Sequence, residues 1–240
     1  MASVLSVAQD ASLAIGIEYP TQLYSGTTRV LRELAGVANE CARMIAYDTG
    51  HDWSRLKTLG TFTGDGVTLA FDLPADYRRM LKQARLWPSA TPYDPFTHIA
   101  DTDEWLGMQA QAFPALNGAW TIIGRQVHIR VGGSTTPLGT GDTAQFYYVS
   151  DYPVESVAGV AKSAFVADDD VFRLDDRLLK LAIIYRWKQL KQQDYAEELS
   201  DYSNALAERI GNDKGSNVFA VGGRRANSLY ATFAYPGTLG

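Results

Sequence analysis

Apolar residues recur every three or four positions in two stretches near the start of the chain, a spacing that predicts amphipathic helices. Residues 3–15 predict a short helix that begins at Ser3 and is stopped by Gly16. Residues 27–47 predict a longer helix of about five to six turns. Its apolar face consists of Val30, Leu34, Val37, Ala38, Cys41 and Ile45.

The helical spacing returns towards the end of the chain. Residues 174–192 are apolar over much of the helix circumference, which predicts the central helix of a bundle. Asp194 and Glu197 stand at capping-box spacing, and the helix that they open is expected to end at Gly211. Neither terminal part can bury its apolar face alone, so we expect the first and last helices to pack together.

The middle of the chain has the β-branched and aromatic runs of a sheet. Strands are predicted within residues 61–74, 84–89, 119–131 and 143–149. The first of these runs predicts two strands around the turn Gly64-Asp65-Gly66, and the third predicts a hairpin that turns at Gly124-Arg125. A helix is expected to begin at Asp101 within this region.

Together these elements predict an α+β fold, in which a bundle of N- and C-terminal helices holds an inserted antiparallel β domain and the chain ends in an extended arm. We expect residues 1–58 and 166–211 to form the bundle and residues 59–165 to form the β domain. Residues 212–240 have no helical period and too few apolar residues for a core of their own.

Charge is unevenly distributed along the chain. The net charge is −5, but residues 212–240 hold three basic residues against one acidic residue, which leaves −7 on residues 1–211. A net negative charge on residues 1–211 argues against a protein that binds nucleic acid tightly, although it would let nucleic acid slide past. The single cysteine, Cys41, lies on a predicted apolar helix face and is expected to be a buried hydrophobe.

The stretch YDTGHDW, residues 47–53, contains the Asp-Thr-Gly triplet of aspartic peptidases at Asp48. Those enzymes need a second such triplet, because two close carboxylates must share a proton. The chain has no second copy, and a helical pattern rather than a strand precedes Asp48. We therefore interpret the stretch as a helix end terminated by Gly50, with Trp53 as a structural anchor for the turn that follows.

No other pattern predicts catalytic, cofactor-binding or metal-binding residues. His51, His98 and His128 lie in separate segments without ligand spacing, and Asp168-Asp169-Asp170 lacks the alternation of a calcium loop. We therefore expect neither a cofactor nor a metal. A basic stripe is expected to pair with acidic residues of the neighbouring helix or of another subunit rather than with DNA. The stripe consists of Arg173, Arg177, Lys180, Lys188 and Lys191.

The C-terminal arm combines aromatic and arginine residues in a glycine- and serine-rich segment. This is the composition of a protein interface, and exposed aromatic residues would favour aggregation unless they dock. The predicted interface residues are Phe219, Arg224, Arg225, Tyr230, Phe233 and Tyr235. Their partner is expected to be either a different protein or a neighbouring subunit, and an arm folded back on its own domain is the alternative.

Several short motifs occur in an order that resembles the head-to-tail adaptors of tailed bacteriophages, the gateway or tail tubular protein A family. They are Asp52-Trp53 after the long helix, Leu73-Pro74 followed by an acidic and an aromatic residue, and a last helix pair with Trp187-Lys188 and Asp194-Tyr195. They span most of residues 25–210. No such match is found in the arm or in the middle of the β region.

The resemblance implies a virion structural protein without catalysis, located at the head–tail junction and assembled in the host cytoplasm. Adaptors of this kind form a homo-oligomeric ring, usually of twelve copies, beneath the portal protein. The genomic DNA passes through the centre without specific binding, and the lower face meets a tail or nozzle protein. The resemblance also implies that the arm clamps the portal.

Three alternatives remain open from the sequence. A head-completion protein of similar design would have the same elements. A carbohydrate-binding β module could use Trp87, Trp105 and Trp120 to stack on sugars, although tryptophans in apolar runs are usually core residues. An aspartic peptidase acting through Asp48 is the third.

Overall fold

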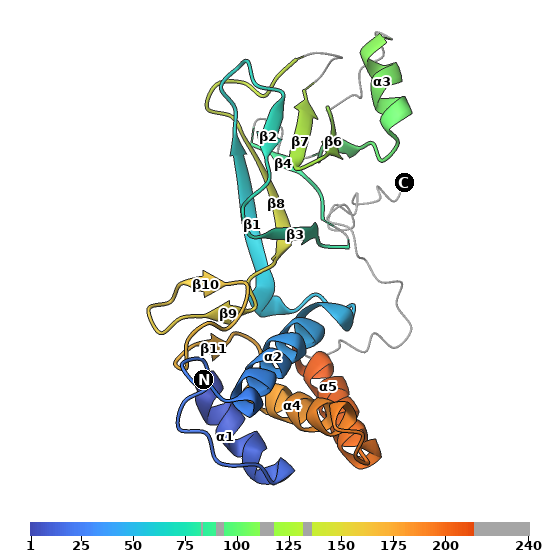
Figure 1. The fold of residues 1–240 in the computed structure, drawn as a ribbon. Coiled ribbons are helices and arrows are strands. Elements are labelled where there is room, and N and C mark those ends of the chain that lie inside the picture. The colour runs from blue at the N-terminus through green and yellow to red at the C-terminus, as the bar shows by residue number, and fades with distance from the viewer. Residues whose placement is uncertain (83, 90–93, 111–117, 132–135, 214–240) are drawn as a thin grey trace, which may run out of the picture.

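The computed structural model describes residues 1–82, 84–89, 94–110, 118–131 and 136–213. Four helices gather at one end of an elongated molecule, and two β-sheets with the short helix α3, Thr102–Ala110, occupy the other end (Figure 1). The long strands β1, Lys57–Thr63, and β8, Thr143–Ser150, run between the two ends. The predicted α+β class, with helices from both termini, is confirmed.

The helical end consists of α1, Val4–Ile15, α2, Arg29–Arg43, α4, Asp176–Leu190, and α5, Ala196–Asp213. Capping residues explain where three of these helices begin, since the side chains of Ser3, Thr28 and Asp175 each accept a bond from a first-turn amide. Gly16 adopts the left-handed conformation, φ 71°, that ends α1 as predicted.

One helix changes its type before its predicted end, and one predicted helix end was wrong. The long helix expected for residues 27–47 changes after Arg43 into a π-helical turn, Met44–Asp48. The last helix passes through Gly211 and continues to Asp213, because Asp213 is held by Ser54 and His51 from the turn after α2. A glycine inside a helix costs only about 1 kcal/mol relative to alanine, which such bonds can offset.

The β region contains two four-stranded sheets. In one, β8 pairs on one edge with β1 and on the other with β3, Tyr77–Met80, and β4, Trp87–Pro88. The other has the order β2-β7-β6-β5, and all its pairs except β5–β6 are antiparallel. Its strands are Ala70–Asp72, Gln126–Arg130, Ala119–Ile123 and Thr97–His98, in that order. The predicted hairpin of residues 119–131 is confirmed as β6–β7.

The two strands predicted around Gly64-Asp65-Gly66 do exist, but they do not pair with each other. Strand β1 pairs with β8 and β2 pairs with β7, so the chain crosses from one sheet to the other at this turn. The turn docks on a distant loop, where the Gly64 amide donates to the Asp142 carbonyl and the Gly66 amide to the Leu138 carbonyl. These long-range bonds hold the turn, and no hairpin ladder forms between β1 and β2.

Two main cores hold the molecule together. The helical core includes Leu34, Ile45, Trp53, Ile183 and Trp187 and extends to Val149 at the end of β8. The β core packs Phe62, Phe146 and Tyr148 against residues of both four-stranded sheets. A three-stranded sheet borders the helical core, and it contains β9, Val154–Glu155, β10, Ala161–Lys162, and β11, Val171–Phe172.

Candidate interaction surface

Trp53 closes the turn between α2 and β1. Its side chain is only 1% exposed, and its Nε1 atom donates a hydrogen bond of 2.9 Å to the Ile45 carbonyl in the π-helical turn. The last carbonyls of a helix have no partner within the helix, so this bond satisfies one of them in the protein interior. Gly50 has a φ of 65°, which lets the chain reverse between the helix end and Trp53.

Two residues of the same turn, His51 and Ser54, bind Asp213 at the end of α5. The Asp213 carboxylate accepts a bond of 2.9 Å from the Ser54 amide and one of 2.6 Å from the Ser54 hydroxyl, and it lies 3.0 Å from His51 Nε2. Burial alone would raise the pKa of Asp213, but the bonds from Ser54 and His51 outweigh it and hold this pKa below its ordinary value. Serine and histidine both bind the carboxylate, so the trio lacks the serine–histidine contact of a nucleophilic triad.

Residues 78–82, in strand β3 and just after it, bind the turn from the side of the sheets. Arg79 forms an ion pair of 2.5 Å with Asp52, and Lys82 donates to the Gly50 carbonyl at 3.0 Å. The Arg78 guanidinium lies 3.9 Å from the centre of the Tyr47 ring and also pairs with Asp151 at 2.8 Å. Residues 78–82 therefore fasten the helical end to the β region.

Asp76 organises the beginning of β3. Its carboxylate accepts bonds of 2.7 Å from both the Tyr148 hydroxyl and the Ser150 hydroxyl, and its carbonyl accepts from the Asp151 amide. Burial, and then the bond to Asp76, raises the pKa of the Tyr148 phenol well above its ordinary value. The Asp76 side chain thus fixes where β8 leaves the sheet and the chain returns to the helices.

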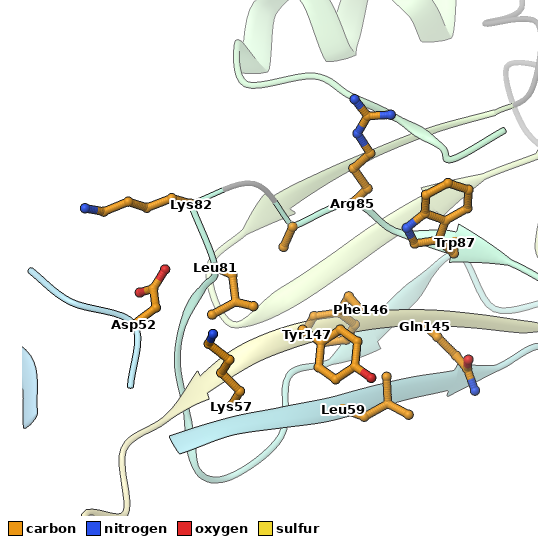
Figure 2. Close-up of a pocket in the computed structure, with 11 residues that line it drawn as sticks. Asp52, Lys57, Leu59, Leu81, Lys82, Arg85, Trp87, Gln145, Phe146 and Tyr147 are labelled. Atoms are coloured by element: carbon orange, nitrogen blue, oxygen red, sulfur yellow. The ribbon is translucent and has the colours of Figure 1, made fainter. Parts of the chain in front are cut away.

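A groove of about 600 Å³ begins at this junction and follows the outer face of β1 and β8. Figure 2 shows Leu59 and Tyr147 on its floor, Lys57 and Lys82 near Asp52, and Arg85 beside Trp87. Leu59 and Tyr147 are directly paired across the two strands and are 48% and 54% exposed. An exposed apolar floor beside three cationic side chains is the composition of a protein-binding surface.

A sequence model of the family described as SU10 adaptor protein matches residues 6–227. The chain belongs to this family. The match confirms the resemblance to phage head-to-tail adaptors, and it covers both the helices and the β region. No curated protein matches the chain.

The adaptor is therefore a structural component of a bacteriophage virion. Two of the motifs that carried the resemblance lie at one junction: Asp52-Trp53 is in the turn after α2, and Asp76-Tyr77 is at the start of β3, whose Arg79 binds Asp52 in that turn. The family match ends at residue 227, so it includes Phe219, Arg224 and Arg225 of the arm.

Trp53 is buried and its role as an anchor stays a prediction, whereas the predicted interface residues of the arm all lie outside the described residues. These are Phe219, Arg224, Arg225, Tyr230, Phe233 and Tyr235. Asp48 is exposed at the end of the π-helical turn, as expected for a helix end. Cys41 is buried in the helical core, and burial raises the pKa of its thiol to about 12.

The tryptophans considered for sugar binding do not form a platform. Trp105 and Trp120 are buried at 1% and 4% exposure, and only the half-buried Trp87 reaches the groove. Trp105 lies against the Arg130 guanidinium, 4.7 Å from the ring centre. The structure thus places two of the three rings where a sugar cannot stack on them.

Two further charged groups have structural roles in this adaptor. Asp168 accepts bonds from the Leu23 and Tyr24 amides, and the fully buried Asp170 pairs with Lys162 at 2.6 Å.

In the basic stripe, Lys188 pairs with Glu198 of α5 as expected, while Lys191 pairs with Glu33 of α2. No group of three or more metal-binding side chains occurs within the part of the chain that the structure describes.

None of the described helices is long and apolar enough to cross a membrane.

Sequence reasoning missed the groove and the residues that bind the turn from β3. The alternation in β1 and β8, where Lys57 and Leu59 share a face with Gln145 and Tyr147, was the available signal. It was overlooked because strand pairing across more than 80 positions cannot be read from a local pattern.

Proposed function

We propose that this adaptor forms a ring beneath the portal, joins the capsid to the tail and lets the genome pass through its centre. The observation that supports this role best is the junction between the two ends of the subunit. The buried bond from Trp53 to Ile45 and the bonds from Ser54 to Asp213 hold the turn before β1 against the helices, and the Arg79–Asp52 pair fastens this turn to the sheets. A subunit built in this way can hold one partner at each end while keeping them at a fixed separation.

The copy number of twelve and the identities of the neighbours follow from the family resemblance. The portal protein is the proposed upper partner, and a tail or nozzle protein is the proposed lower partner. Copies in a ring meet through two different faces, so each subunit needs two complementary surfaces. Assembly takes place in the host cytoplasm before the particle is complete.

The charge of the chain is consistent with a passage for DNA. Residues 1–211 carry a net charge of −7, and DNA phosphates are repelled by surfaces of the same sign. Sequence-independent DNA binding requires clusters of lysine and arginine that release counterions. The lysines of the helical end are instead engaged with acidic partners, as Lys188 is with Glu198 and Lys191 with Glu33.

In this proposal the C-terminal arm binds the portal. The arm begins where α5 ends, and Asp213 ties this point to Ser54 in the junction. The arm carries Lys214, Arg224 and Arg225 without an acidic residue after Asp213. Its aromatic residues, among them Phe219 and Tyr230, would supply the apolar anchors of the contact.

Co-expression of this adaptor with the portal of the same phage, followed by electron microscopy, tests the proposal. The expected result is a ring of adaptor copies on one face of the portal. Deletion of residues 214–240 keeps Asp213 and should abolish portal binding while leaving the thermal unfolding of residues 1–213 unchanged. Absence of any adaptor ring on the portal, or portal binding that survives the deletion, would contradict the corresponding part of the proposal.

Imaging of the intact particle separates this role from the closest alternative. A head-completion protein of similar design would lie below the adaptor ring rather than directly against the portal. Density for the α-helical bundle in contact with the portal is the result expected here.

A further inference from the structure

The groove on β1 and β8 has cationic groups that no described residue of its own subunit neutralises. Lys57 and Arg85 are exposed, and neither side chain has a hydrogen bond or ion pair among the residues that the structure describes. Asp52 lies at one end of the groove but is already paired with Arg79. In a chain with a net charge of −5, this groove is a local surface of opposite sign.

The floor of the groove favours a protein partner over DNA. Leu59 and Tyr147 are about half exposed and lie between the cationic side chains. A phosphate backbone would leave these apolar groups without a partner, whereas a protein surface can supply carboxylates together with aliphatic carbon atoms. The basic arm of the chain is disfavoured as an occupant because its charge has the same sign as the groove.

An acidic surface of matching character lies on helix α5. Glu197, Asp201 and Glu208 are spaced by four and seven residues, which places them on one side of the helix, and all three are exposed. Within the described chain none of these three has an ion pair, in contrast to Glu198, which turns towards Lys188 of α4. We call Glu197, Asp201 and Glu208 the acidic stripe.

The Glu208 end of the acidic stripe and the Lys57 end of the groove both lie near the junction between helices and sheets. Helix α5 ends at Asp213, whose carboxylate binds Ser54, and Ser54 lies only three residues before Lys57 in the groove. Glu208 is five residues from that helix end, which is about 8 Å along the axis. Copies related by rotation about a ring axis can therefore bring stripe and groove to one height.

We propose that the groove of one subunit receives the acidic stripe of a second copy of this chain. This inference rests on the proposed ring, and it assigns the two unlike faces that such a ring requires. Carboxylates of the stripe face Lys57 and Arg85, while the helix surface covers Leu59 and Tyr147. Long-range attraction between the two surfaces orients the incoming subunit, so assembly slows as salt concentration rises.

Two charge-reversal variants test the contact. The groove variant is Lys57→Glu with Arg85→Glu, and the stripe variant is Asp201→Lys with Glu208→Lys. Because neither pair of side chains has a described partner in its own subunit, both variants should fold like the wild type. Matched controls make the same charge changes at exposed positions elsewhere, Arg32→Glu with Arg125→Glu for the groove and Glu18→Lys with Glu104→Lys for the stripe.

Ring formation is measured by electron microscopy and light scattering, with the portal present, for the full-length chain. Each variant alone should need at least about tenfold more protein than the wild type to form rings, because like charges then face each other. An equal mixture of the two variants should form rings again, since every groove in an alternating ring meets a stripe of opposite charge. Controls should assemble like the wild type.

Each outcome bears on one proposal. Absence of wild-type rings on the portal contradicts the proposed adaptor ring itself. Wild-type rings together with normal rings of both variants overturn the groove assignment and leave the ring intact. Variants that lose assembly but are not rescued by mixing also overturn it. Weaker binding of a short DNA duplex by the groove variant, with normal rings, would instead assign the groove to nucleic acid.

Discussion

The Nε2 atom of His51 lies 3.0 Å from the Oδ2 atom of Asp213, although 162 positions separate the two residues in the chain. The contact joins the turn after α2 to the last described residue of α5. Both side chains are largely buried, at 5% and 9% exposure, so water does not replace either partner. The root of the C-terminal arm is thereby fixed at the junction between helices and sheets.

Removal of the Asp213 carboxylate should destabilise this junction. Asp213→Ala leaves the Ser54 donors and His51 without their acceptor, and we expect a loss of about 1–3 kcal/mol in the free energy of unfolding at pH 7. Urea denaturation followed by circular dichroism measures it. Asp48→Ala, at an exposed carboxylate of the same stretch, is the control and should change stability by less than about 0.5 kcal/mol.

The contribution of Asp213 should depend on pH in the acid range. Its pKa is lowered in the folded protein, so the unfolded chain takes up the proton first as pH falls. The stabilisation is therefore complete above the ordinary carboxyl pKa of about 4 and is lost as pH falls through the lowered folded value. The difference between wild type and Asp213→Ala should shrink below pH 4, and a constant difference would contradict this assignment.

Truncation of Trp53 should have the largest single effect. Trp53→Ala opens a cavity in the helical core and leaves the Ile45 carbonyl without its main donor, for an expected loss of about 3–5 kcal/mol. Trp53→Phe keeps most of the packing and should cost less, and Asp48→Asn should leave folding and ring assembly nearly intact. A stable Trp53→Ala protein that still forms rings would show that the anchor is dispensable.

Gly64 should not tolerate a side chain. A Cβ atom at this position would lie 2.3 Å from the Gly139 carbonyl oxygen and 2.5 Å from that of Leu138, both backbone atoms that cannot move aside easily. Gly64→Ala is expected to cost about 1–3 kcal/mol in unfolding experiments. Gly36→Ala is the matched control: its Cβ meets nothing within 4 Å, and this helical position should gain about 0.5–1 kcal/mol.

Asp76 should act together with its two hydroxyl donors. Asp76→Ala is expected to destabilise the protein by about 1–3 kcal/mol, because Tyr148 and Ser150 lose a common acceptor. Tyr148→Phe removes one donor and should cost less. The double variant should be more stable than the sum of the two single losses predicts, and strict additivity in this double-mutant cycle would rule out a direct coupling.

The helices could be predicted from sequence because their signals are local. Ser3 and Gly16 bound α1 within one segment, and the spacing of Leu34, Ala38 and Cys41 is that of a buried helix face. The β6–β7 hairpin was equally accessible, since its two strands are adjacent and turn at Gly124 with a φ of 63°. In each case the information lies within a few residues of the element that it specifies.

The junction and the groove could not be predicted, because their contacts join distant segments. Arg79 meets Asp52 across 27 positions, and Leu59 pairs with Tyr147 on a strand that follows most of the β region. The strand partners of residues 61–74 could not be predicted for the same reason, since bonds from Gly64 and Gly66 to residues 138–142 turn the chain from one sheet to the other. The family resemblance pointed to the correct residues at the junction without revealing what they contact.

The pairing of β1 with β8 has a mechanical consequence. Among the described residues, the chain passes from helices to sheets near Lys57 and returns near Ser150, and the register Lys57↔Val149 holds these two passages side by side. Seven registered pairs extend this double strand over about 20 Å. A pull on the β region is shared by two covalent strands, and bending would also have to break the Arg79–Asp52 pair. We therefore expect the subunit to be stiff along β1 and β8, so that a displacement of its sheets also displaces its helices.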